Sequence, residues 1–182
     1  MNMKETALIL TALRNAYPHS YRDLGPRDFE QMIELWQSMF EDDSYAEVSA
    51  AVKALITSRT VGYSPVIGEV KEKLHALRHV GELSEQDAWA MVSKACANGL
   101  YGYQKEFDKL PPEVQRAVGS PEQIKAWAAM DVETVESVVA SNFMRNYRTQ
   151  AARKKEFDML PESVRTVIGP LADSLKLIGG AG

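Results

Sequence analysis

Two histidines, His75 and His79, lie four residues apart, a spacing that places both rings on one face of a helix, where they could chelate zinc. A zinc site needs further protein ligands, and no cysteine or other histidine lies close to the pair in the sequence. The three intervening residues, Ala-Leu-Arg, lack the glutamate that acts as general base in a metalloprotease helix. The sequence therefore favours two exposed histidines and predicts no metal site.

Other residues that could carry out a reaction are few. The single cysteine, Cys96, lies on the apolar side of a predicted helix, whereas a reactive thiolate needs an exposed, electropositive site. The chain has no P-loop, no glycine-rich dinucleotide loop and no G-x-S-x-G elbow. The acidic run from Glu41 to Asp43 precedes a predicted helix start, where it would stabilise the positive end of the helix dipole. We therefore expect no enzyme activity, no catalytic residue and no cofactor, and rank a small carboxylate or histidine enzyme last.

The most asymmetric charge feature is a stretch of five basic residues with no acidic residue between them. We call it the basic stretch, and its members are Arg145, Arg148, Arg153, Lys154 and Lys155. At helical spacing Arg145 and Arg148 share a face, which Arg153 can join. Cations near the C-terminal end of a helix are stabilised by its dipole, so a solvated face explains the stretch equally well. As candidate partner-binding residues they could meet an acidic protein surface or a phosphate backbone.

Composition places these residues in an ordinary globular protein. The chain has 182 residues, of which 45% are hydrophobic and 25% charged, enough for one medium domain or two small ones. Its net charge of −4 argues against a protein that coats nucleic acid, because that affinity depends on neutralising phosphates. One cysteine excludes an internal disulfide and suits a reducing compartment, and no run approaches the roughly 20 apolar residues of a membrane span. We therefore expect a cytoplasmic protein that does not bind membranes.

The elements that must position these residues are predicted to be helices throughout, because apolar residues recur at steps of three and four. An N-terminal four-helix bundle is expected over residues 1–79. Its later helices should begin at Gly25-Pro26, at the capping box that starts with Ser44, and at Ser64-Pro65. Residues expected on the inner faces include Leu8, Leu13, Trp36, Val52 and Leu77. Four such helices must pack on one another.

A second helical region is expected over residues 82–178. Ser84 should cap its first helix, and a long helix should run from about Asp131 to about Met159, carrying the basic stretch. The glycine-rich end, residues 179–182, should be a flexible tail. The complete prediction is an all-α protein of two helical parts, without a strand pattern of useful length.

The second region contains an internal repeat with an offset of 50 residues. The sequence KEFDKLP at 105–111 recurs as KEFDMLP at 155–161, and a valine and a glycine follow at matching positions, the glycines being Gly119 and Gly169. Each copy predicts a helix ended by proline, followed by a short amphipathic turn ended by glycine. Two similar packing corners explain the repeat more simply than a duplicated docking unit, and two copies are too few for a solenoid.

A family resemblance rests on the order of signals between residues 4 and 78. The residues that carry it are Tyr17-Pro18 after the first helix, Trp36, Tyr45 after an acidic turn, the Val48–Val52 helix, and Ser64-Pro65-x-Ile67-x-x-Val70. This order resembles the bacteriophage replicative-helicase loader and inhibitor family, in which a Pro-x-Ile-x-x-Ile/Val segment begins the last helix of a small N-terminal bundle. The second half looks like the longer versions found in phage and prophage replication modules.

The resemblance implies a protein that binds a hexameric DnaB-type replicative helicase. Members of the family hold the helicase inactive in solution and help deliver it to an origin marked by a phage initiator. The family has no ATPase, which agrees with the missing P-loop. Its shorter members contact the helicase through a flexible C-terminal segment, whereas the C-terminal half of this chain is predicted to be helical. The main alternative is a small DNA-binding protein, an initiator or a repressor, that uses the basic stretch on phosphates.

Overall fold

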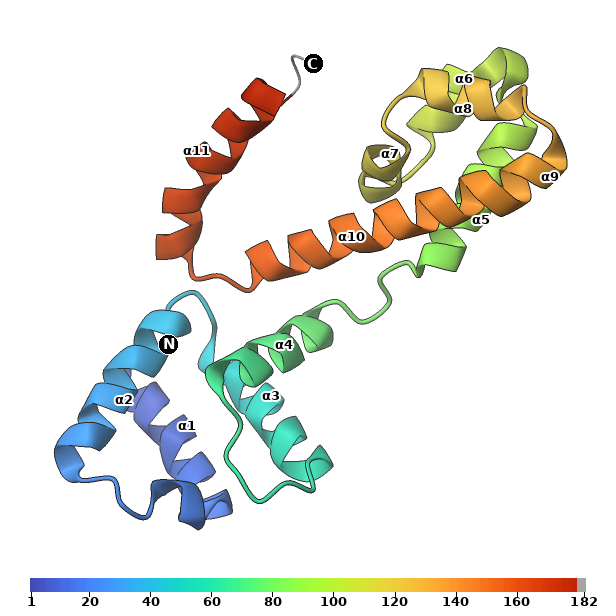
Figure 1. Cartoon of the computed structure of the whole chain (residues 1–182). Coiled ribbons are helices and arrows are strands. Elements are labelled where there is room, and N and C mark those ends of the chain that lie inside the picture. The colour runs from blue at the N-terminus through green and yellow to red at the C-terminus, as the bar shows by residue number, and fades with distance from the viewer. Residues whose placement is uncertain (180–182) are drawn as a thin grey trace. The chain divides into compact units, whose positions relative to one another are not determined.

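A computed structural model describes the backbone of residues 1–179 and the side chains of residues 1–170 (Figure 1). Every regular element in this part of the chain is a helix, so the predicted all-α class is confirmed. The chain forms two compact units. The first unit contains Met1–Val80 together with the residues from Glu156 onward, and the second contains Gly81–Lys155. No helix that the structure describes has the length and apolar character needed to cross a membrane.

Four helices pack around one core in the first unit, as predicted. They are α1 (Met3–Ala16), α2 (Pro26–Met39), α3 (Tyr45–Ser58) and α4 (Ile67–Arg78), with a short 3-10 helix, η1 (Pro18–Tyr21), after α1. The buried side chains include Leu10, Leu13, Trp36, Phe40, Val48, Val52, Val70 and Leu74. Some residues expected to point inward do not, among them Leu8, which is 58% exposed, and Leu77, which is 42% exposed. Leu8 lies beside the buried stripe of α1, and Leu77 lies in the last turn of α4.

The start of α3 follows the predicted capping box. The Ser44 hydroxyl accepts a hydrogen bond from the Glu47 N–H, and the Ser44 N–H donates to the Glu47 carboxylate, both at 3.3 Å. Glu47 also accepts from the Arg78 guanidinium at 2.9 Å. These bonds, Arg78 first and Ser44 second, lower the pKa of Glu47 to about 2.

Glu47 should therefore give the protein a pH-dependent contribution to stability. A carboxyl group whose pKa falls on folding stabilises the folded state above its unfolded pKa, about 4.3, and this contribution disappears as the pH falls towards 2. Because the Glu47 side chain is 44% exposed, Glu47→Gln should cost about 1 kcal/mol or less at pH 7. In urea titrations the difference from wild type should shrink between pH 5 and pH 3. Glu30→Gln, at an exposed position of α2, is the control, and a constant Glu47 difference would contradict the assignment.

The predicted start of α4 at Ser64-Pro65 is wrong by two residues. The helix begins at Ile67, its N-cap is Val66, and the Val66 N–H donates to the Glu69 carboxylate at 2.9 Å. Ser64 is bound elsewhere, because its N–H donates to the Ser20 hydroxyl at 3.0 Å and its own hydroxyl shares a 2.8 Å hydrogen bond with that of Tyr21. A serine before proline therefore fixes the loop to η1 here and does not cap the helix.

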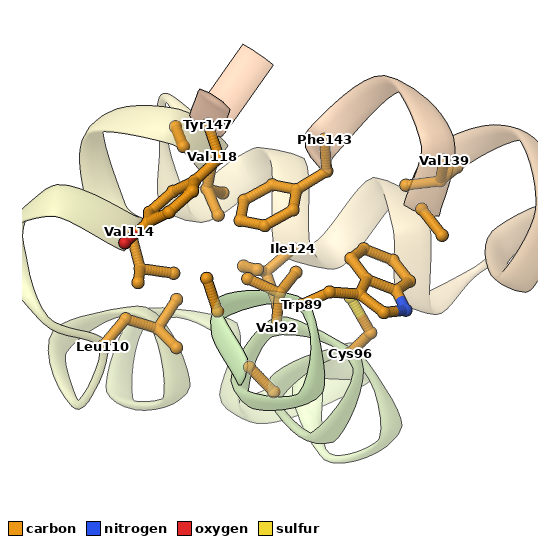
Figure 2. Packing of buried hydrophobic residues seen from close by; sticks show 14 of the residues in the cluster. Trp89, Val92, Cys96, Leu110, Val114, Val118, Ile124, Val139, Phe143 and Tyr147 are labelled. Atoms are coloured by element: carbon orange, nitrogen blue, oxygen red, sulfur yellow. The ribbon is translucent and has the colours of Figure 1, made fainter. Parts of the chain in front are cut away.

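The second unit is built from short helices and one long helical stretch. The short helices are α5 (Glu85–Ala97), α6 (Gly99–Asp108), α7 (Pro112–Val118) and α8 (Pro121–Ala128). The long stretch comprises α9 (Val132–Thr134), the π-helical segment η2 (Val135–Val139) and α10 (Ala140–Asp158), which confirms the predicted long helix. Ser84 caps α5 as predicted, since its hydroxyl accepts from the Asp87 N–H at 3.1 Å. Helices α5, α7, α8 and α10 all contribute side chains to the core in Figure 2.

The two copies of the repeat begin with the same turn. The Leu110 N–H donates to the Phe107 carbonyl at 3.0 Å, and the Leu160 N–H donates to the Phe157 carbonyl at 3.1 Å. In the first copy, Gly119 follows α7 with a φ of +97°, a conformation that favours glycine. The second copy differs from the prediction, because α11 (Glu162–Gly179) continues through Gly169 and the following proline. Of the expected flexible tail, Gly179 is the last residue of α11, and residues 180–182 lie outside the described part.

The acidic run from Glu41 to Asp43 contacts the start of α11, which the sequence did not indicate. The Glu162 N–H donates to Asp42 at 2.6 Å, and the Ser163 N–H donates to Glu41 at 3.0 Å. Carboxylates thus satisfy backbone donors at the N-terminus of this helix, which a helix dipole favours. These contacts explain why the residues from Glu156 onward group with the first unit, although the helical pattern predicted one region over residues 82–178.

Candidate interaction surface

The basic stretch lies on the side of α10 that faces away from the core of the second unit. Ala140, Phe143 and Tyr147 are the core-facing residues of this helix, and each is less than a tenth exposed. Figure 2 shows the rings of Phe143 and Tyr147 within the apolar cluster. Four of the five basic residues are exposed and the fifth is half-buried; in chain order they are Arg145, Arg148, Arg153, Lys154 and Lys155. The apolar face of α10 therefore fixes which way its arginines point.

Arg148 is held by a carboxylate of the same unit. Its guanidinium donates two hydrogen bonds to Glu85, one from Nε at 2.7 Å and one from an Nη. This contact lowers the pKa of Glu85 and raises that of Arg148. The Arg148 side chain is nevertheless 71% exposed, so solvent screens the pair and it stabilises the fold little. Its main effect is to fix the guanidinium in one orientation, as bidentate pairs do.

Arg145 and Arg153 differ from Arg148, because neither forms an ion pair with any residue in the described part of the chain. Both are exposed. An arginine presents a planar set of N–H donors that matches carboxylates and phosphates. Such unpaired guanidinium groups on a rigid helix can recognise an acidic partner without first breaking an internal salt bridge. The two arginines are therefore the strongest candidates within the basic stretch.

A groove that the sequence did not indicate runs beside the same helix. It has a volume of about 390 Å³. Its lining residues are Ala117, Val118, Gln123, Trp127, Val139, Asn142, Phe143 and Asn146. Asn146 also donates to the Ala117 carbonyl at 3.0 Å, which ties α10 to α7. The lining comes from α7, α8, η2 and α10, so no single segment of sequence could have revealed it.

The remaining candidate residues from the sequence are Cys96 and the pair His75 and His79. Cys96 is buried as expected, and burial raises the pKa of its thiol to about 11, which makes it a poor nucleophile at neutral pH. The expectation of two exposed histidines is wrong, because His75 and His79 are both half-buried and their rings stack with centroids 3.9 Å apart. Asp158 lies close to both, from a segment about 80 residues further along the chain.

Comparison with known proteins identifies a family for the first part of the chain. Residues 1–71 match the family model for the N-terminal domain of a bacteriophage helicase loader and inhibitor. This match covers α1, α2, α3 and the start of α4, fewer than half of the 182 residues. No curated protein and no solved structure matches the chain. The resemblance inferred from the sequence is confirmed for the N-terminal domain.

Proposed function

We propose that this protein binds a hexameric replicative helicase in the bacterial cytoplasm, holds it inactive in solution and helps load it at a phage origin. The observation that carries the proposal is the match of residues 1–71 to the N-terminal domain of a phage helicase loader and inhibitor. A phage initiator bound at the origin would be the second partner. Such a protein needs no reaction of its own, because a ligand that binds one state of a helicase ring better than another shifts the ring towards that state.

Within this proposal, the basic stretch on α10 contacts the helicase. The exposed positions of Arg145 and Arg153, without ion pairs among the described residues, support this role. A partner surface rich in carboxylates would complement them, since opposite charges steer association and fix its register. Arginine is also enriched among the residues that dominate binding energy in protein interfaces. The adjacent groove, which Gln123, Asn142 and Asn146 line together with apolar residues, would accept a side chain from the same partner.

The test mixes the purified full-length protein with the host replicative helicase and measures both co-elution and ATP turnover. Wild type should co-elute with the ring and lower its turnover. The double variant Arg145→Glu/Arg153→Glu should bind at least 10-fold more weakly, a loss of about 1.4 kcal/mol. Lys94→Glu/Lys105→Glu changes the charge of the second unit equally at exposed positions outside the stretch, and should bind as wild type does.

The possible outcomes distinguish a failure of the helicase proposal from a failure of the role assigned to the basic stretch. Absence of a complex together with unchanged turnover would refute the helicase proposal. A complex weakened equally by both double variants, or by neither, would refute only the role of the basic stretch. Binding to duplex DNA that weakens steeply with salt and disappears in Arg145→Glu/Arg153→Glu would favour the alternative of a DNA-binding initiator or repressor.

A further inference from the structure

We propose that His75, His79 and Asp158 form a binding site for a zinc-like transition-metal ion in the first unit. One ligand atom from each of the three side chains lies within 4.8 Å of the other two, and all three residues are half-buried. His75 lies in the last turn of α4, His79 is the C-cap residue of the same helix, and Asp158 is the last residue of α10. The sequence argument against a metal was the lack of a third ligand, and Asp158 supplies it.

The two histidines have the i, i+4 spacing at which a helix can present two metal ligands on one side. His75 is in α4 and His79 caps its C-terminus four residues later, and their rings lie 22° from parallel with centroids 3.9 Å apart. His79 Nδ1 lies 2.8 Å from the His75 carbonyl oxygen. A carbonyl can only accept, so Nδ1 donates in this bond, which makes Nε2 the ring nitrogen that would ligate a metal. A backbone carbonyl commonly orients a ligating histidine in this way.

The type of ligand selects the class of ion. Two imidazoles and a carboxylate suit zinc, cobalt, nickel or copper, whereas magnesium and calcium prefer sites made entirely of oxygen. Zinc binds nitrogen and oxygen at about 2.0–2.2 Å, so the donor atoms of a tetrahedral site lie about 3.4 Å apart. Small side-chain rotations of His75, His79 and Asp158 would bring them to this spacing from their positions within 4.8 Å. Three protein ligands leave one tetrahedral position for water.

Three cations line the cavity of about 140 Å³ that borders this site, and each of them has a carboxylate partner. Lys71 and Arg78 pair with the buried carboxylate of Asp43, at 2.6 and 2.8 Å. Arg165 lies 3.2 Å from Asp42 and also pairs with the adjacent Glu162. These pairs compensate the positive charges locally, which reduces their repulsion of a bound metal ion. The negative charge of Asp158 then favours the ion directly.

A metal held by these residues would fasten the segment that leads into α11 to the helical bundle. Asp158 is the last residue of α10, and only three residues separate it from the first residue of α11. His79 and Asp158 are far apart in sequence, and a cross-link that closes a long loop restricts the unfolded chain more than a short one. The ion would therefore stabilise the contacts of α11 with Glu41 and Asp42 in addition to α4 itself.

The experiment titrates metal-free, full-length protein with Zn²⁺ by calorimetry and with Co²⁺ by visible absorption. One ion should bind per chain. His75→Ala, His79→Ala and Asp158→Asn should each weaken binding at least 10-fold, since loss of even an outer-shell partner costs about 10- to 100-fold. His19→Ala is the matched control, because His19 is the only other histidine of the chain and lies in η1, where it bonds with Arg22. It should leave the affinity unchanged.

Hydrogen exchange gives a second measurement that does not depend on the affinity alone. Zn²⁺ should slow amide exchange between residues 156 and 165 in wild type and in His19→Ala, and should leave it unchanged in Asp158→Asn. Circular dichroism confirms that each variant is folded. Binding that survives Asp158→Asn, or that is lost equally in His19→Ala, would overturn the proposed site, as would the absence of any bound ion in wild type.

Discussion

Replacing Asp43 with alanine is expected to lower the free energy of unfolding by about 3–5 kcal/mol, the usual cost of removing one partner from a buried ion pair. The Asp43 side chain is only 4% exposed and pairs with two cations, Lys71 at 2.6 Å and Arg78 at 2.8 Å. Arg78 keeps a second partner in Glu47. Lys71 is 11% exposed and would keep its contact with the ring of Phe40, 4.7 Å from the ring centroid, but would have no salt bridge among the described residues. A buried ammonium that has lost its salt-bridge carboxylate is the main source of the loss.

Urea titration followed by circular dichroism measures this loss. Asp23→Ala, at an exposed position after η1, should change the free energy of unfolding by less than about 0.5 kcal/mol. Combining Asp43→Ala with Lys71→Met should recover part of the stability, because it removes the charge that the first substitution leaves unpaired. A cost below about 1 kcal/mol for Asp43→Ala would mean that water reaches the pair and screens it.

Local signals explain why most of the fold could be predicted. Ser44 and Ser84 cap the helices that follow them, with the bonds expected from a serine three residues before an acidic side chain. Both the cap and its partner lie within one turn, so the sequence contains the whole interaction. Ser64 failed as a cap because Ser20 and Tyr21 bind it, and they lie more than 40 residues earlier. A rule based on neighbouring residues could not predict that Ser64 binds Ser20 and Tyr21 in place of the helix N-terminus.

Distance along the chain also limits what could be predicted of the candidate sites. Helical spacing placed Arg145 and Arg148 on one face of the predicted helix, but it could not show that Arg148 binds Glu85, 63 residues away. In the same way, the sequence showed the spacing of His75 and His79, but it could not show that Asp158 lies beside them. A hydrophobic pattern of period 3.6 shows which side of a helix is buried, but it does not show which residues from distant parts of the sequence contact that helix.

The repeat shows a further limit, because similar sequences were expected to end in similar turns. Gly119 ends α7 with a positive φ, whereas Gly169 lies inside α11. The first copy buries Val114 and Val118 in the core of the second unit, while Ile168, which matches Val118, is 38% exposed. The same motif therefore serves a buried corner in one copy and a longer, more exposed helix in the other. Tertiary packing, which differs between the copies, determines where each helix ends.

Phe143→Ala is expected to destabilise the second unit by about 3–5 kcal/mol, the usual cost of removing a buried phenyl ring. Phe143 is 3% exposed and lies between two other rings, with centroids 5.6 Å from Trp89 and 6.0 Å from Tyr147. Figure 2 shows it at the centre of this aromatic group. Its loss would leave a cavity that joins the groove it already lines, so water could enter between α8 and α10.

Phe157→Ala provides the matched control on the same helix. Phe157 is 39% exposed, so its removal should cost about 1 kcal/mol or less. Thermal melting and urea titration compare the two variants directly, and equal losses would show that the aromatic cluster does not hold α10 in place. Phe143→Leu should recover most of the stability, because leucine refills much of the volume.

Since Phe143 also orients Arg145 and Arg148, helicase binding should fall in Phe143→Ala in proportion to unfolding and return in Phe143→Leu. Loss of binding in a fully folded Phe143→Leu variant would instead place the phenyl ring itself in the interface.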